Sequence, residues 1–160
     1  MNAILAIDPG TKCGFAIRDR SGTLVSGTWN LKGGRFEGGG MRFLRLKKKI
    51  EEAHTLSQFK EVYFEEVRNH KGVDAAHIYG GIVAVLTSFC EDNAIPYQGI
   101  PVGTIKKRAT GKGNAKKELV LAAARAKWPE QDIKDDNQAD ALWLLDVVTE
   151  NKIETDLVKE

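Results

Sequence analysis

The chain has 160 residues, of which 42% are hydrophobic and 29% charged, with a formal net charge of +2. This composition is ordinary for a soluble globular protein, and the length suits one domain spanning residues 1–160. No apolar run reaches about 18 residues and the N-terminus lacks a secretory signal, so we expect no membrane partner and a cytoplasmic location. Cys13 and Cys90 are too far apart for a zinc motif and are expected to be reduced and buried.

The hydrophobic pattern predicts five strands and five helices. The strands are expected at residues 3–8, 14–19, 23–30, 61–67 and 95–100. The helices are expected at residues 41–56, 73–92, near 102–108, 115–127 and from Asp136 to about Asn151. Short turns make the first three strands antiparallel, whereas helical connections make the first, fourth and fifth parallel. These features predict an α/β fold, with a mixed five-stranded sheet and helices on both faces.

Acidic residues interrupt apolar surroundings at three places. Asp8 ends the first strand, Glu65 and Glu66 lie in the fourth, and Asp136 and Asp140 lie at the start of the last helix. If the first and fourth strands are neighbours, these carboxylates can meet at one edge of the sheet. Such a cluster persists only if it is protonated or holds a cation, and oxygen-only ligands favour Mg²⁺ or Mn²⁺. The pattern therefore predicts a metal site suited to phosphodiester hydrolysis.

Each of these residues also has a simpler interpretation. Asp8 precedes Pro-Gly and could begin a turn, and Asp136 could cap the last helix, although capping is compatible with a role in the site. Glu66 could be a solvated strand residue. His70 could assist proton transfer or lie exposed in its loop.

Basic residues cluster in two segments. Residues 93–117 contain no acidic residue but contain Lys106, Lys107, Arg108, Lys112, Lys116 and Lys117. The second segment contains Arg42, Arg45, Lys47, Lys48 and Lys49. Clustering of this kind indicates a polyanionic partner, although both segments could simply be solvated helix faces.

Four segments in chain order resemble a known family over nearly the whole chain. "ILAIDPGTKCGFAI", "YFEEV", "IKKRATGKGNAKKELV" and "DDNQADALWLL" resemble RuvC, the Holliday junction resolvase of the RNase H-like superfamily. The "GxGNAKKE" form is more similar to the shorter resolvases of phages and prophages, which act in the bacterial host cytoplasm. The resemblance implies an RNase H-like sheet of strand order 3-2-1-4-5, with strand 2 antiparallel.

The resemblance also implies roles for individual residues. Asp8 matches the first catalytic aspartate, Glu65 the catalytic glutamate and Asp140 the last aspartate. Lys106 and Lys117 match lysines near the scissile phosphate or the DNA, and Lys117 would stabilise the phosphate during the reaction. The implied cofactor is Mg²⁺, with two ions per site and Mn²⁺ as a substitute, and no small-molecule cofactor.

The chain departs from the family pattern at two positions. The cellular family has an aspartate three residues before the last one, where this chain has Asn137, so Asp136 is the candidate fourth carboxylate. The cellular family also has an aromatic residue three positions after its glutamate, where this chain has Arg68. DNA contacts are therefore expected from Arg68, Lys106, Lys107, Arg108, Lys112 and Lys116.

The implied activity is resolution of four-way DNA junctions by a homodimer that makes paired symmetric nicks. The apolar segment 73–92 could form the dimer face, with Gly80 and Gly81 permitting close approach, or could be buried within the monomer. Alternatives are a nuclease for flaps, branched DNA or RNA–DNA hybrids, and a junction-binding protein without catalysis. The first hairpin also resembles that of sugar kinases and actin-like ATPases, but those folds need far more than 160 residues.

Overall fold

The protein is built on one mixed β-sheet. Our computed structural model describes residues 1–159, with side chains through Asn151. The strands are β1 (Ile4–Asp8), β2 (Lys12–Arg18), β3 (Leu24–Asn30), β4 (Glu61–Glu66) and β5 (Tyr97–Pro101). Their order is β3-β2-β1-β4-β5, with β2 antiparallel to both neighbours and β1, β4 and β5 mutually parallel. The predicted sheet is therefore confirmed.

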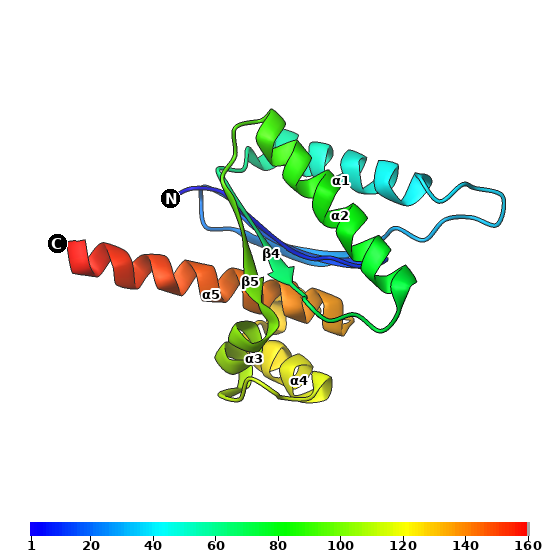
Figure 1. The fold of residues 1–160 in the computed structure, drawn as a ribbon. Helices are drawn as coiled ribbons and strands as arrows, with labels where there is room; N and C mark the ends of the chain where they lie inside the picture. The colour runs from blue at the N-terminus through cyan, green and yellow to red at the C-terminus, as the bar shows by residue number, and fades with distance from the viewer. Residues whose placement is uncertain (160) are drawn as a thin grey trace.

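Helices cover both faces of this sheet. One face carries α1 (Met41–Ser57) and α2 (Val73–Asp92), and the other carries α5 (Asp136–Lys159), as Figure 1 shows. Next to α5 lie α3 (Val102–Thr110) and α4 (Lys117–Lys127), and the short 3₁₀ helix η1 (Pro129–Gln131) leads into α5. The prediction that the last helix ends near Asn151 is wrong, because α5 continues to Lys159. Residues 151–159 contain no glycine or proline that would stop a helix.

Alternation along β1 separates two hydrophobic cores. Leu5 and Ile7 pack among residues of α1 and α2, whereas Ile4 and Ala6 pack among residues of α5 and α4. Because successive side chains of a strand point to opposite faces, Asp8 projects on the same face as Ile4 and Ala6. The fold thus directs the carboxylate at the end of β1 toward α5.

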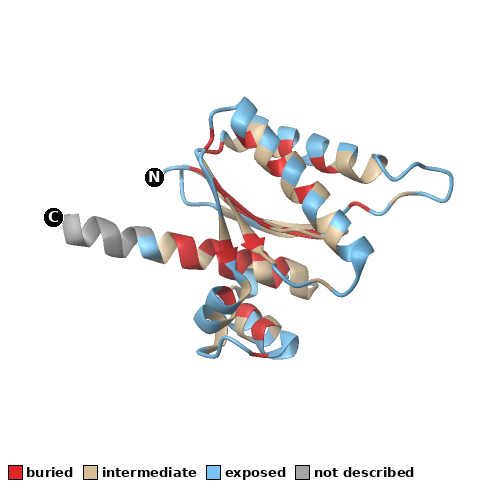
Figure 2. Ribbon diagram, in the orientation of Figure 1, coloured by how far each residue is buried: buried red, intermediate tan, exposed pale blue. Residues whose placement is uncertain are grey.

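The helix α2 is covered on one side only. It buries Ile82, Leu86 and Cys90 against the sheet and α1, while much of its outer surface is exposed (Figure 2). The alternative that this segment is buried within the monomer therefore holds for one side of the helix only. Within the described residues, α2 is the one helix whose length and mean hydropathy of 1.4 would suit a membrane span. Its buried stripe belongs to the core of this fold.

Candidate active site

Three carboxylates meet at one edge of the sheet. Asp8 ends β1, Glu65 lies near the end of the neighbouring parallel strand β4, and Asp140 lies one turn into α5. One oxygen from each side chain lies within 4.8 Å of one from each of the others. Glu65 is only 8% exposed, and Asp8 and Asp140 are partly exposed. The structure thus brings together the carboxylates whose meeting the sequence predicted.

Burial and mutual repulsion disfavour negative charge on these side chains. Burial, then the neighbouring Glu65, raises the pKa of Asp8 well above its usual value. Burial likewise raises the pKa of Asp140 to about 7, with Glu65 and Asp136 adding to the shift and Lys117 and Lys106 opposing it. A cation would remove this penalty, and a set of carboxylate oxygens fits Mg²⁺ or Mn²⁺. The site therefore has the donor chemistry of a hard-cation site.

Asp135, rather than Asp136, caps α5. Its Oδ1 accepts a hydrogen bond from the Gln138 backbone N–H at 2.8 Å and another from the Thr28 hydroxyl at 2.8 Å, which ties the helix start to β3. The alternative of Asp136 as the cap is therefore wrong. Asp136 instead pairs with Lys117, with 3.3 Å between Oδ2 and Nζ. Asp136 is not part of the three-carboxylate cluster, so its role as a metal ligand stays a prediction. To bind a metal, Asp136 would have to leave its ion pair with Lys117.

Gly14 sets how closely α5 approaches the sheet. It lies opposite Asp8 in the β1–β2 register, and a Cβ at this position would overlap the backbone carbonyl of Asn137. Only glycine leaves room for this contact, which brings the first turn of α5 against β2. Gly14 was not among the residues predicted from the sequence, although a glycine within an apolar strand is a signal of close backbone approach.

Tyr79 fixes the backbone around Glu65. Its hydroxyl donates to the Glu65 carbonyl at 2.9 Å and accepts from the Val67 N–H at 3.1 Å. The His70 ring lies against the Tyr79 ring, with centroids 4.8 Å apart, and its Nε2 lies 3.2 Å from the Val67 carbonyl. Sequence analysis missed Tyr79, because a tyrosine on an apolar helix gives no signal of its partners. A proton-transfer role for His70 stays a prediction.

Basic residues of α3, α4 and the β4–α2 loop differ in their surroundings. Lys106 and Lys117 lie close enough to Asp140 to lower its pKa. Arg68 is exposed and pairs with Glu66, with 3.5 Å between Nε and Oε1. The other lysines predicted to bind DNA, Lys107, Lys112 and Lys116, are exposed.

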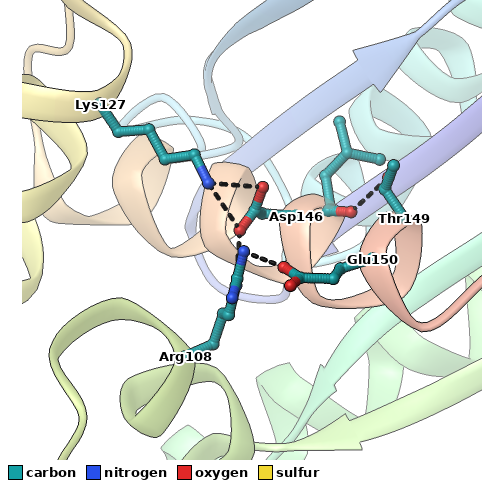
Figure 3. A network of polar contacts seen from close by, with 6 residues as sticks. Arg108, Lys127, Asp146, Thr149 and Glu150 are labelled. Carbon is teal, nitrogen blue, oxygen red and sulfur yellow. Dashed lines mark hydrogen bonds and ion pairs between the residues drawn. The ribbon is translucent and has the colours of Figure 1, made fainter. Parts of the chain in front are cut away.

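Arg108 is already paired with two carboxylates of α5. Figure 3 shows its guanidinium between Asp146 and Glu150, with Nε donating to Asp146 Oδ2 at 2.8 Å. Lys127 of α4 donates to Asp146 Oδ1 at 3.0 Å. This network joins α3 and α4 to α5. Contact of Arg108 with DNA stays a prediction, because Arg108 would have to leave Asp146 and Glu150 to bind a phosphate.

The fold is that of the RuvC-like Holliday junction resolvases. RuvC from Thermus thermophilus superposes with a TM-score of 0.69 at 21% identity, over 89% of this chain and 90% of that one. The T. thermophilus RuvC complex with a Holliday junction substrate gives a TM-score of 0.70 at 20% identity, over 90% of each chain. The yeast mitochondrial Holliday junction resolvase Ydc2 gives 0.55 at 12% identity, over 88% of this chain and 76% of that one. No family model and no curated protein matches the chain by sequence.

Proposed function

We propose that this protein is a metal-dependent DNA endonuclease that resolves four-way junctions by paired symmetric nicks. The observation that carries the proposal is the cluster of Asp8, Glu65 and Asp140 in the fold of junction resolvases, with Lys106 and Lys117 beside it. Carboxylates this close must either bind protons or hold a cation, and the lysines supply charge for a phosphate. The site thus combines the two requirements of phosphodiester hydrolysis.

Asp8, Glu65 and Asp140 are the residues that would hold Mg²⁺, or Mn²⁺ in its place. When bound there, two such ions would supply activation of water and stabilisation of the leaving oxygen. The chain itself orients the three carboxylates, because β1, β4 and the capped start of α5 are fixed by the sheet register and by Asp135. Asp136 would join the site if a phosphate displaced it from Lys117.

Lysines would hold the scissile phosphate and the neighbouring backbone. Lys117 projects from the first turn of α4 toward Asp136, and Lys106 lies on α3 near Asp140. A DNA phosphate placed over the carboxylates would meet both ammonium groups, which would stabilise the extra charge of the transition state. Exposed Arg68, Lys107, Lys112 and Lys116 would contact more distant phosphates, which makes affinity strongly salt-dependent.

A homodimer through α2 would suit a substrate with near two-fold symmetry. A Cβ at Gly81 would overlap the Phe43 ring of α1, so this glycine serves packing within the monomer. A Cβ at Gly80 would meet nothing within 4 Å, so Gly80 lies on the free face. We expect Gly80→Gln to convert the dimer to a folded monomer in sedimentation velocity, whereas a monomeric wild type would contradict the dimer.

The proposed activity is tested with labelled four-way junction, flap, duplex and RNA–DNA hybrid in Mg²⁺, Mn²⁺ or EDTA. We expect paired nicks in the junction alone with either metal, and none in EDTA or with Asp8→Asn. The exposed Asp92 provides a matched control, because Asp92→Asn makes the same change far from the carboxylate cluster and should cleave normally. Equal cutting of flaps or hybrids would replace the proposal by a broader nuclease, and binding without cleavage would replace it by a junction-binding protein.

A further inference from the structure

The loop of residues 31–40 is anchored at both ends. It joins β3 to α1 and extends away from the sheet (Figure 1). Leu31 is buried, and its N–H donates to the Thr11 carbonyl at 2.8 Å. At the other end, Glu37 accepts a hydrogen bond from Arg45 of α1 at 2.6 Å. The loop therefore has a defined position relative to the sheet.

Phe36 lies uncovered in this loop. The Glu37 N–H donates to the Gly34 carbonyl at 3.1 Å, which closes a turn with Arg35 and Phe36 at its centre. The Phe36 side chain is 95% exposed, and the Arg35 guanidinium carbon lies 5.6 Å from its ring centroid. Aromatic rings are ordinarily covered in folded proteins, so an uncovered ring in an anchored turn suits contact with a partner.

This turn leaves the sheet at the same edge as the carboxylates. Asn30, the last residue of β3, pairs with Lys12 of β2, and Asp8 pairs with Gly14 two residues further along β2. Within residues 31–42 the cations are Lys32, Arg35 and Arg42. The single acid of this segment is Glu37, and its charge is met by Arg45. The segment is therefore positively charged, and it leaves the sheet at the end where the scissile phosphate would bind.

We propose that the turn around Phe36 is a second DNA-contact element, in which the Phe36 ring stacks on an unpaired base and Arg35 contacts a phosphate. This inference rests on the proposed function, because it assumes a branched DNA substrate. Bases at a branch point can leave their stack and expose a π-face, whereas bases within a duplex cannot without unpairing. The Phe36 ring thus contributes selectivity for branched over linear DNA.

The test compares binding of one four-way junction and one linear duplex of matched sequence in EDTA, which prevents cleavage. Base–aromatic stacking predicts that Phe36→Ala weakens junction binding by roughly 5- to 150-fold and duplex binding by less than about twofold. Phe36→Tyr should bind as the wild type does, because it keeps the ring. Leu56→Ala is the matched control, since Leu56 is 87% exposed at the far end of α1 and should leave both affinities unchanged.

Three results would overturn the inference. Phe36→Ala could bind the junction as tightly as the wild type, or could lose affinity equally for junction and duplex. A wild type that binds the junction no better than the duplex would instead contradict the proposed substrate, and the stacking role with it. Arg35→Gln tests the phosphate contact independently of base stacking. It should weaken binding to both DNAs and reduce the slope of log affinity against log salt by about one.

Discussion

Two aspartates of α5, six residues apart, have opposite surroundings. Asp140 faces Asp8 and Glu65, and its pKa is raised to about 7 by burial and by its acidic neighbours. Asp146 accepts hydrogen bonds from Arg108 and Lys127, so two cations meet its charge. The charge of the same residue type on one helix is therefore only partly compensated at one end of the sheet and is paired with two cations at the other.

This difference divides α5 into a part that carries the proposed site and a part that joins α5 to α3 and α4. The first turns carry Asp136 and Asp140, where charge repulsion costs free energy unless a cation binds. The middle of the helix carries Asp146 and Glu150, whose ion pairs hold α3 in place. Carboxylates left without cationic partners in a buried site are typical of functional sites, whereas paired ones mostly maintain structure.

Replacing Asp140 should produce the largest change in activity. Asp140→Asn keeps the shape of the side chain but removes a charged oxygen from the proposed metal site. Loss of outer-shell partners typically costs 10- to 100-fold in metal affinity or activity, so loss of a direct ligand should lower cleavage by more than about 100-fold. Cleavage of a labelled junction in Mg²⁺ measures this effect, and unchanged cleavage would contradict the assignment of Asp140.

Replacing Gly14 should disturb the carboxylate cluster indirectly, by moving the start of α5. In Gly14→Ala the new methyl group overlaps the Asn137 carbonyl, so the first turn of α5 must move away from β2. Overpacking of this kind should lower the free energy of unfolding by about 1–3 kcal/mol and weaken Mg²⁺ binding. Urea unfolding and metal titration measure the two effects.

Gly38→Ala is the matched control, because a Cβ at Gly38 would meet nothing within 4 Å. It should leave stability unchanged or raise it by up to about 1 kcal/mol. Equal stability of the Gly14→Ala and Gly38→Ala variants would show that the close approach of α5 is not needed.

Local patterns in the sequence were sufficient to predict the strands and a set of candidate carboxylates, whereas the choice of Glu65 over Glu66 came from the resemblance to resolvases. Asp8, Glu65 and Asp140 each interrupt an apolar run, which marks them in the sequence. The pairing of β1 with β4, which the sequence left as a condition, makes Asp8 and Glu65 neighbours. The resemblance to resolvases added the strand order. These predictions succeeded because periodicity and crossover rules act within short stretches of chain.

Contacts between distant segments could not be predicted in this way. Asp135 caps α5 by accepting a hydrogen bond from the Gln138 N–H, and the Thr28 hydroxyl, 107 residues away in sequence, donates to the same Asp135 oxygen and ties this cap to β3. The pairing of Arg108 with Asp146 likewise depends on how α3 packs on α5. A cluster of cations in the sequence can therefore contain two kinds of residue. Some are exposed and could contact a phosphate, and others, such as Arg108, already form ion pairs within the fold.

Changes in pH should alter metal-free stability and metal binding in opposite directions. The pKa of Asp140, raised to about 7, and the raised pKa of Asp8 mean that the folded protein holds protons that the unfolded chain has released. Stability from these groups is therefore complete below about pH 4 and is lost as pH rises through 7. Mg²⁺ displaces the same protons, so its affinity should rise with pH by up to about tenfold per pH unit for each proton displaced.

We would compare thermal unfolding of the wild type and Asp140→Asn in EDTA between pH 5 and 8. The difference between the two proteins measures the contribution of Asp140 to the pH dependence of stability. The wild type should lose more stability with rising pH than the variant does, because the variant lacks the repelled charge. Mg²⁺ should stabilise the wild type more at pH 8 than at pH 6. A larger loss of stability in Asp140→Asn would contradict the interpretation of the cluster.

Replacing Asp146 should have the smallest effect, because its partners are accessible to water. Lys127 also lies over the Trp128 and Trp143 rings, 5.3 and 5.4 Å from their centroids, so it keeps contacts when its carboxylate is lost. Ion pairs with exposed partners contribute at most about 1 kcal/mol, so Asp146→Asn should lower the free energy of unfolding by no more than that. Metal affinity and cleavage should stay close to wild type, in contrast to Asp140→Asn. If Asp146→Asn abolished cleavage as Asp140→Asn does, the division of α5 into functional and structural parts would be wrong, because the ion pairs of α3 would then control the carboxylates.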